Sequence, residues 1–232
     1  MPSTVYHALI PAAGNGFRFG SSLPKQYLTL QGKPVLQHAL DRLRTSFPLS
    51  AAYIVLAPDD HWFDEAIVVG ENVKVLRCGG ATRAESVRNA LEALQPVDGD
   101  DWVVVHDGVR PCLDRPSSLR LQQELTDDAV GGFLALPVSD TLKRVDGNAR
   151  AVRTESREAL WRAQTPQMFR YHVLRRAFVL PGLERWTDEA HAVEALGLQP
   201  RAVLGSACNV KITFPEDLAL AAAILMAEDR RP

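Results

Sequence analysis

The stretch Val5–Gly20, with the sequence VYHALIPAAGNGFRFG, decides how this chain folds. Its first six residues, Val5 to Ile10, are mostly apolar and have the pattern of a buried strand. The residues that follow are rich in alanine and glycine, and Arg18 lies among them. Small residues directly after a strand let backbone N–H groups approach a phosphate without obstruction by a Cβ atom. The stretch therefore predicts an α/β unit with a loop that binds phosphate.

Outside this stretch, short apolar runs alternate with amphipathic helical patterns. Continuous apolar strands between helices indicate a mostly parallel, twisted sheet with helices on both faces, as in Rossmann-like folds. Ligands of such sheets bind at the carboxyl ends of the strands. The further strands are expected at Tyr53–Leu56, Val73–Leu76, Trp102–Val105, within Ala129–Pro137, and at Ala202–Leu204. The helices are expected around Val35–Leu43, Phe63–Ile67, Ala84–Leu94, Leu119–Leu125, Tyr171–Leu180, Thr187–Gly197 and Leu218–Met226.

Two helix starts and one hairpin are predicted from local signals. Thr187 is a good N-cap for the helix that follows it, and Thr213–Glu216 has the spacing of a capping box. Ser139–Arg153 is charged and alternating, with a turn at Asp146–Asn148, so it predicts a hairpin that leaves the main body. No long linker interrupts the chain, and we expect one domain over residues 1–232 with 138–157 as a protruding arm.

Composition excludes several classes of protein. The 232 residues carry 26 Lys and Arg against 28 Asp and Glu, a net charge of −2, which argues against wholesale nucleic-acid binding. The longest apolar runs fall far short of the roughly 20 residues that cross a bilayer. The three cysteines are widely scattered and form no Cys-x-x-Cys pair, so a reduced compartment is expected. These features favour a cytoplasmic protein without a membrane or nucleic-acid partner.

The glycine loop points to phosphate rather than to a dinucleotide. Gly14, Gly16 and Gly20 miss the G-x-G-x-x-G spacing by one residue, and no Gly-Lys-Ser/Thr of a P-loop is present. The alternative is a glycine turn that merely joins a strand to a helix. Arg18 and Lys25 favour phosphate binding, because they add positive charge to the same segment.

Two further turns follow predicted strands. Asp107 comes just after Trp102–Val105, where a carboxylate could contact Mg²⁺ directly or through water, although for one isolated Asp a turn-capping role is favoured. Gly79–Ser86 is a glycine turn that could let backbone groups read a base, and a plain helix start explains it nearly as well. His106, His172 and His191 are too dispersed for a metal triad, and we expect structural roles for them.

In order and spacing, these segments resemble the cytidylyltransferases that make 4-diphosphocytidyl-2-C-methyl-D-erythritol in the non-mevalonate isoprenoid pathway. The resemblance covers nearly the whole chain. It implies a nucleotidyltransferase fold with a β-hairpin arm for dimerisation. The matching segments are Pro11–Arg18, Pro24–Tyr27, Gly79–Val87, His106–Pro111, Asp140–Lys143, Thr165–Gln167, Thr187–Ala190, Asn209–Thr213 and Pro215–Leu218.

The resemblance also implies roles for individual residues. Arg18 and Lys25 would be catalytic, binding the CTP phosphates and stabilising charge at the α-phosphorus. Lys211 and Arg110 would bind the substrate phosphate, with Thr141 and Arg157 supplied by the arm of a neighbouring subunit. Asp107 would lie near Mg²⁺. The nucleotide-binding residues would be Ala12, Ala13, Gly14, Gly16, Gly80, Ser86, Asp107 and Gly108. The chain has no polar side chain at Ala81 or Gly108, so a ribose contact there would use backbone.

The implied activity is transfer of the CMP moiety of CTP to 2-C-methyl-D-erythritol 4-phosphate by a Mg²⁺-dependent homodimer. Its products are the diphosphocytidyl alcohol and pyrophosphate. The nearest alternative is a ribitol-5-phosphate cytidylyltransferase of wall polymer synthesis, which only the substrate pocket would separate. A dinucleotide-dependent oxidoreductase is disfavoured by the glycine spacing. A nucleotide-binding regulator is disfavoured by the full set of charged residues.

Overall fold

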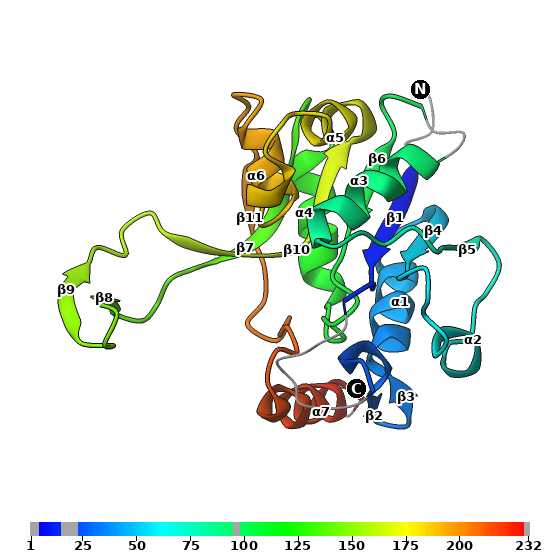
Figure 1. Ribbon diagram of the computed structural model, residues 1–232, viewed down its shortest axis with the longest axis horizontal. Helices are drawn as coiled ribbons and strands as arrows, with labels where there is room; N and C mark the ends of the chain where they lie inside the picture. Colours follow the sequence, from blue (N-terminus) through cyan, green and yellow to red (C-terminus); the bar gives the residue numbers. More distant parts are fainter. Residues whose placement is uncertain (1–4, 15–22, 95–97, 230–232) are drawn as a thin grey trace.

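A computed structural model describes residues 5–14, 23–94 and 98–229 of the chain, so the predicted site residues Gly16 and Arg18 lie outside the described residues. The described part is built on a seven-stranded sheet with the order β11-β7-β10-β6-β1-β4-β5 (Figure 1). All neighbouring pairs are parallel except those of β10, which runs antiparallel to β6 and β7. The strands are β1 (Tyr6–Pro11), β4 (Leu49–Val55), β5 (Val73–Leu76), β6 (Trp102–Val105), β7 (Gly131–Pro137), β10 (Trp161–Arg170) and β11 (Arg201–Leu204).

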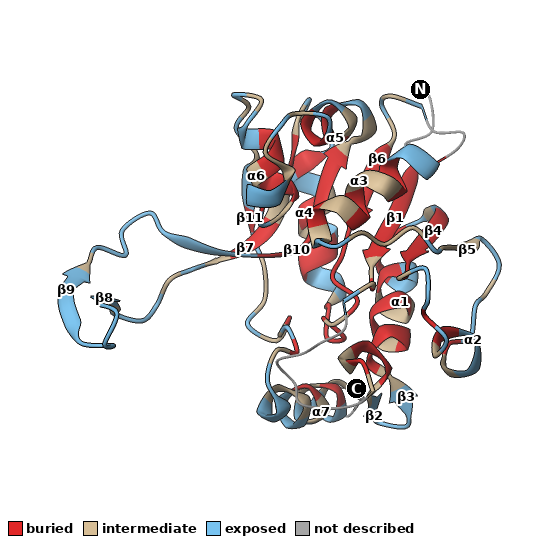
Figure 2. Cartoon of the chain, in the orientation of Figure 1, coloured by how far each residue is buried: buried red, intermediate tan, exposed pale blue. Residues whose placement is uncertain are grey.

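Helices cover both faces of this sheet because successive strand residues point to opposite sides. Ile10 of β1 packs in a cluster with Leu40 and Leu121, and its neighbour Leu9 packs in another with Val87 and Leu174. The first cluster is covered by α1 (Val35–Ser46) and α4 (Arg115–Leu125). The second is covered by α3 (Arg83–Ala93), α5 (Tyr171–Phe178) and α6 (Glu189–Glu194). Figure 2 shows the buried strands between these layers.

The smaller elements lie around this body. A third cluster places Ile212, Ala221 and Leu225 against Leu30 and Val35, which packs the C-terminal helix on the segment between β1 and α1. The remaining elements are η2 (Lys25–Tyr27), β2 (Thr29–Leu30), β3 (Lys33–Pro34), α2 (Phe63–Ala66), η3 (Leu183–Arg185) and α7 (Pro215–Asp229). In the part of the chain that the structure describes, no helix combines the length and apolar character needed to cross a bilayer.

Strand β10 is absent from the sequence-based prediction. It contains Pro166, which follows a cis peptide bond, and its pairing with β7 is interrupted between Ala163 and Gln167. Because proline cannot donate to a ladder and rarely occurs inside a central strand, the segment carries no clear strand pattern. The prediction of a mostly parallel sheet with helices on both faces is nevertheless confirmed.

Both predicted helix caps are wrong. The side chain of Asp188, not Thr187, accepts the N–H of His191 at the start of α6, at 2.9 Å. Helix α7 begins at Pro215, and the carboxylate of Asp217 accepts the N–H groups of Thr213 and Phe214, each at 2.8 Å. The Thr213 hydroxyl donates instead to the carbonyl of Lys211. At α6 a carboxylate therefore replaces the expected hydroxyl as the capping acceptor, and at α7 a carboxylate inside the helix accepts from the two residues before it.

The predicted hairpin is confirmed. Strands β8 (Leu142–Val145) and β9 (Ala151–Glu155) pair antiparallel as a separate two-stranded sheet that projects from the body (Figure 1). Nearly all of its residues are exposed (Figure 2). A two-stranded sheet is marginally stable alone, so an arm of this kind suits a contact with another surface.

Candidate active site

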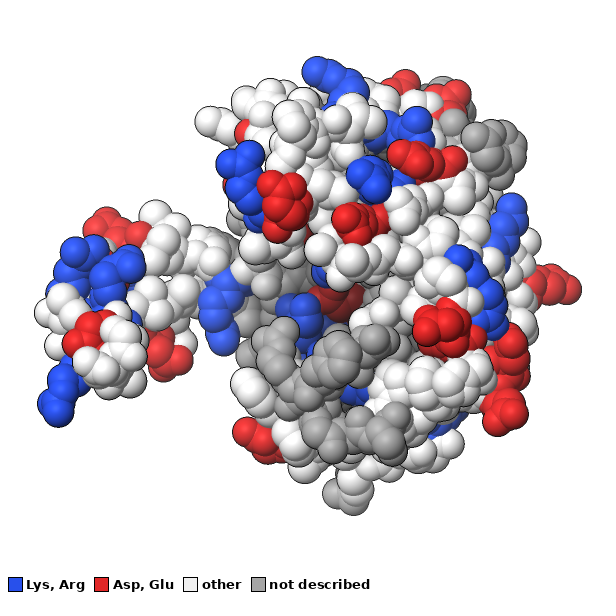
Figure 3. All heavy atoms as spheres, viewed as in Figure 1, with Lys and Arg blue, Asp and Glu red and all other residues white. Residues whose placement is uncertain are grey.

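A cleft of about 630 Å³ opens at the carboxyl ends of four neighbouring strands. Residues 12–14 follow β1, 57–59 follow β4, 79–83 follow β5 and 107–109 follow β6, and all of them line the cleft. Lys25 and Lys211 complete it from outside the sheet. Figure 3 shows acidic and basic side chains side by side in a hollow near the centre of the view. The cleft lies at the carboxyl ends of the strands, where the sequence predicts a ligand.

Two glycines of the cleft, Gly79 and Gly108, pack tightly against neighbouring residues. A Cβ atom at Gly79 would collide with the side chain of Ala13 and lie 2.8 Å from the carbonyl oxygen of Leu56. A Cβ at Gly108 would lie 2.9 Å from the side chain of Leu36. Glycine at these two positions therefore lets the two turns pack directly on their neighbours.

Lys25 is fixed by the residues that follow it in the short helix η2. Gln26 donates from Nε2 to the carbonyl of Ala12 at 2.9 Å, and Tyr27 donates its hydroxyl to Asp60 at 2.7 Å. Burial raises the pKa of Tyr27, so its hydroxyl stays protonated and remains a donor. The Lys25 ammonium donates to the carbonyl of Ile212 at 3.0 Å. These bonds tie Lys25 to β1 on one side and to the segment that carries Lys211 on the other.

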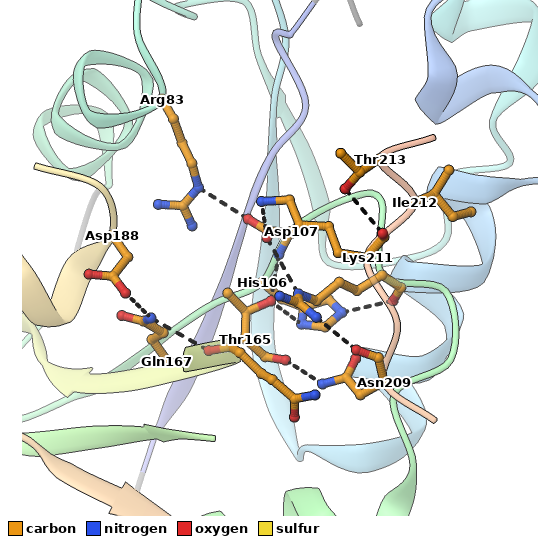
Figure 4. Close-up of polar contacts among 12 residues, drawn as sticks. Arg83, His106, Asp107, Thr165, Gln167, Asp188, Asn209, Lys211, Ile212 and Thr213 are labelled. Carbon is orange, nitrogen blue, oxygen red and sulfur yellow. Dashed lines mark hydrogen bonds and ion pairs between the residues drawn. The ribbon is translucent and has the colours of Figure 1, made fainter. Parts of the chain in front are cut away.

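Asp107 is the centre of a cluster of three cations (Figure 4). One carboxylate oxygen lies 3.1 Å from Arg83 Nε, and the other lies 2.9 Å from Lys211 Nζ and 3.5 Å from Arg110 Nε. Burial alone would raise the pKa of the Asp107 carboxyl, but the three cations outweigh that effect and hold the pKa well below its usual range. Asp107 therefore stays ionised and holds positive groups from three different segments at the cleft.

Arg83 is in turn held by a buried carboxylate that the sequence analysis does not single out. Its two terminal nitrogens bind Glu189 at 2.6 and 3.1 Å in a bidentate pair, and Glu189 is fully buried at the start of α6. Burial raises the pKa of Glu189, and the charge of Arg83 opposes this rise. Arg83 and Glu189 lie within two segments of the family resemblance, Gly79–Val87 and Thr187–Ala190, which is the signal that could have found them.

A second network of neutral groups lies beneath this cluster (Figure 4). The N–H of Asp107 donates to the Thr165 hydroxyl at 3.0 Å, and Thr165 lies 3.0 Å from His106 Nδ1. His106 Nε2 lies 3.0 Å from the carbonyl oxygen of Arg110, which only accepts, so Nε2 carries the proton and Thr165 donates to Nδ1. Burial lowers the pKa of His106 to about 4, which keeps the ring neutral. The expectation of a structural, hydrogen-bonded His106 is confirmed.

Asn209 joins this network to the segment that carries Lys211. The side-chain amide nitrogen of Asn209 donates to the backbone carbonyl of Thr165 at 2.7 Å. The backbone carbonyl of Asn209 accepts from Arg110 Nη1, also at 2.7 Å. Thr165 and Asn209 are buried and come from β10 and from the loop before α7. The position of Lys211 therefore depends on groups from three segments that are distant in sequence. A motif within one stretch of the chain does not show that these segments meet.

Comparisons with known proteins show the family of the chain. Residues 6–227 match the family described as IspD: 2-C-methyl-D-erythritol 4-phosphate cytidylyltransferase. The chain belongs to this cytidylyltransferase family. A relative of that name from Nitrosospira multiformis is 52% identical over 228 residues, covering 95% of this chain and 97% of its own. One from Dechloromonas aromatica is 51% identical over 225 residues, covering 96% and 98%.

Solved structures of the family have the same fold. A crystal structure of 4-diphosphocytidyl-2C-methyl-D-erythritol synthase matches with a TM-score of 0.85 and 36% identity, over 96% of this chain and 99% of its own. The Francisella tularensis 2-C-methyl-D-erythritol 4-phosphate cytidylyltransferase matches with a TM-score of 0.82 and 32% identity, over 95% and 100%. The predicted nucleotidyltransferase fold is therefore confirmed.

Most of the site residues that the family resemblance implies meet in one place. Arg110 reaches the cleft through its ion pair with Asp107. Thr141 and Arg157 are exposed on the arm and are not among the residues that line the cleft of their own chain. The implied residues that line the cleft are Ala12, Ala13, Gly14, Lys25, Gly80, Ser86, Asp107, Gly108 and Lys211.

The surroundings of Asp107 do not suit direct binding of a magnesium ion by its carboxylate. Both carboxylate oxygens are already engaged by cations, at 2.9 to 3.5 Å. Within residues 5–14, 23–94 and 98–229, no group of three or more His, Cys, Asp or Glu side chains could hold a metal ion. The chemistry of Asp107 in this structure is that of a counter-charge for Arg83, Arg110 and Lys211.

Proposed function

We propose that the chain transfers the CMP moiety of CTP to 2-C-methyl-D-erythritol 4-phosphate, giving 4-diphosphocytidyl-2-C-methyl-D-erythritol and pyrophosphate. The observation that carries this proposal is the cleft at the strand ends, where Lys25, Arg83 and Lys211 come together in a member of the cytidylyltransferase family. A phosphate oxygen of the alcohol substrate attacks the α-phosphorus in line, and pyrophosphate leaves. The reaction joins two anions, so it requires positive charge held in advance.

No general base is needed, because the attacking phosphate is already ionised at neutral pH. Catalysis then consists of positioning and of stabilising charge on the crowded phosphorus. Lys25 and Arg18 are proposed for this role, and the anchoring of Lys25 through Gln26 and Tyr27 supports it. The small residues at 12–14 and the turn at Gly80 and Ser86 would receive the nucleotide. The cleft has room there because these residues lack bulky side chains.

Lys211 and Arg110 are proposed to bind the phosphate of the alcohol substrate. Lys211 is 42% exposed and pairs with Asp107, so a substrate phosphate can approach its ammonium from the open side of the cleft. Arg110 is more deeply buried and is fixed by the carbonyl of Asn209. An exposed lysine beside a buried arginine would place two cations on the substrate phosphate.

We further propose that the active form is a homodimer in which residues 138–157 are the dimerisation arm of a single nucleotidyltransferase domain, residues 1–232. The support is the position of Thr141 and Arg157 on an arm that projects from the body (Figure 1), where neither residue lines the cleft of its own chain. Their side chains would act in the cleft of the neighbouring copy. A cytoplasmic location is proposed from the three free cysteines, which suit a reduced compartment.

A divalent cation, Mg²⁺ by preference, is also proposed as a requirement of the reaction. Mg²⁺ usually binds through phosphate oxygens and water with few protein ligands. Because three cations already pair with Asp107, the metal would be held mainly by oxygens of the triphosphate. Removal of divalent ions with a chelator should abolish pyrophosphate release, and added Mg²⁺ should restore it.

The substrate is tested by measuring pyrophosphate release from CTP with 2-C-methyl-D-erythritol 4-phosphate and, separately, with ribitol 5-phosphate. Strong preference for the first supports the proposal, and preference for the second would overturn it. Lys25→Ala should lower the rate on the order of 10²-fold or more while leaving the fold intact. Lys33→Ala is the matched control, since Lys33 is exposed and pairs with Asp41. Near-normal turnover of Lys25→Ala would refute the role of Lys25.

A further inference from the structure

In the turn Gly79–Thr82, which follows β5, every backbone N–H donates to a group of the same chain. The N–H of Gly79 donates to the carbonyl of Leu56 at 2.8 Å, and the N–H of Gly80 donates to the Ser86 hydroxyl at 3.0 Å. The next two N–H groups, of Ala81 and Thr82, both donate to Glu85 Oε2, at 2.7 and 3.3 Å. Four consecutive donors are therefore unavailable to a ligand, although the residues that carry them line the cleft.

Glu85 shapes this turn. A Cβ atom at Gly80 would collide with Cβ of Glu85 and lie 2.9 Å from its Oε2, so the chain at Gly80 passes directly over the Glu85 side chain. Glu85 also belongs to a capping box at the start of α3, in which its own N–H donates to the Thr82 hydroxyl at 3.1 Å. The carboxylate thus folds the turn around itself, and that requires glycine at position 80.

The groups of this turn that remain can only accept hydrogen bonds. In the part of the chain that the structure describes, no hydrogen bond ends on the carbonyl oxygens of Gly80 or Ala81. The Ser86 hydroxyl donates its single hydrogen to the carbonyl of Thr82 at 3.0 Å, so it too can offer a ligand only an acceptor. The turn is therefore an acceptor surface on one side of the cleft.

The neighbouring turn at residues 12–14, which follows β1, offers hydrogen-bond donors instead of acceptors. Among the described residues, the N–H groups of Ala13 and Gly14 have no hydrogen-bond partner, and both residues line the cleft. Gly79 packs on Ala13, so donors and acceptors stand within one small space. Cytosine presents an amino donor at C4 beside the acceptors N3 and O2. Uracil presents a carbonyl at C4, and that carbonyl would face another acceptor.

We propose that Glu85 is a specificity-determining residue that acts on the base through the turn at Gly79–Thr82. By binding the N–H groups of Ala81 and Thr82, its carboxylate leaves the turn with acceptors alone, which match the amino group of cytosine and oppose the carbonyl of uracil. The inference rests on the proposed CTP-dependent function and adds the residue that sets the choice of base. A site that leaves buried polar groups unpaired against the wrong substrate discriminates strongly.

The test compares CTP with UTP in two variants that both break the capping box. Glu85→Ala removes the carboxylate and releases the N–H groups of Ala81 and Thr82. Thr82→Ala removes the other half of the box and leaves those two bonds in place. We expect kcat/KM for CTP over kcat/KM for UTP to fall about tenfold or more in Glu85→Ala and to stay at the wild-type value in Thr82→Ala. Glu85→Gln, whose amide oxygen can still accept, should retain most of the ratio.

Calorimetric binding of CTP and UTP to the same variants separates base recognition from chemistry. The relative affinity should follow the kinetic ratio, with UTP gaining in Glu85→Ala. An unchanged ratio in Glu85→Ala, or an equal loss in Thr82→Ala, would overturn the role of Glu85. If the wild-type protein released no pyrophosphate from CTP, the proposed function itself would fail, and the two failures are therefore distinguishable.

Discussion

Asp107 shows how one carboxylate can organise a site for anions. A lone buried carboxylate is costly, whereas here it is surrounded by Arg83, Arg110 and Lys211, whose own repulsion it offsets. With Glu189 paired to Arg83, the group carries three positive and two negative charges. The site therefore has a small net positive charge of its own, although the whole chain has a net charge of −2. Total charge alone does not reveal a site of this kind.

The role of Asp107 as counter-charge predicts the behaviour of Asp107→Asn. Turnover should fall on the order of 10²-fold, because Lys211 and Arg83 lose the group that holds them. The Mg²⁺ concentration that gives half of the remaining activity should stay within about twofold of wild type. Loss of a true metal ligand or of its support typically costs 10- to 100-fold in metal affinity, so a shift of that size in a Mg²⁺ titration would contradict the assignment. Circular dichroism of the variant checks that it is folded.

His106 predicts a pH dependence of stability. Burial lowers its pKa to about 4, against 6.5 for an ordinary histidine, so between these values the unfolded chain binds a proton that the folded chain does not. The stabilisation from the neutral His106 is complete above about pH 6.5 and is lost as the pH falls toward 4. By pH 4.5 the free energy of unfolding should have fallen by on the order of 2 kcal/mol. Urea unfolding at pH 7 and pH 4.5 should show a larger loss for wild type than for His106→Gln. Equal losses would contradict this account.

At the scale of elements, the sequence predicts what is local and periodic. The parallel strands, most helices and the hairpin are each indicated by apolar periodicity or by a turn signal within a few residues. β10 escapes because Pro166 and the break in pairing after Ala163 remove the strand pattern, although β10 places Thr165 beneath the cleft. Its place between β6 and β7 depends on tertiary pairing, which a short window of sequence does not contain.

The same limit applies to the site. Lys25 and Asp107 can be found from motifs that follow strands, and Lys211 from the family resemblance. The pair of Arg83 and Glu189 joins α3 to α6 across 106 positions of sequence, so only the folded chain shows that these residues meet. The bonds of Glu85 to the N–H groups of the glycine turn likewise appear only in the folded chain.

At the scale of the whole molecule, the arm separates the residues of one proposed site between two chains. The arm stands on β7 and β10, which pair over many residues, so its base is rigid even though its tip is exposed (Figures 1 and 2). Val145 and Val152 on this hairpin are 52% and 63% exposed. Exposed apolar side chains on a projecting hairpin are typical of a surface that another chain covers. Supply of Arg157 to a neighbouring cleft can therefore be tested with two inactive variants.

Mixed dimers of Lys25→Ala and Arg157→Ala decide whether the arm acts on its own cleft or on that of its partner. Each variant alone should be nearly inactive. If the arm acts across the dimer, every mixed dimer contains one cleft with both changes and one that is intact, so random mixing should restore about a quarter of wild-type pyrophosphate release. Lys25→Ala mixed with Lys211→Ala is the control, because both residues lie in the cleft and neither mixed site is intact. Recovery in the first mixture and none in the second assigns the arm to the partner, whereas no recovery in either would place Arg157 in its own subunit's site. Near-normal activity of Arg157→Ala alone would place Arg157 outside the site.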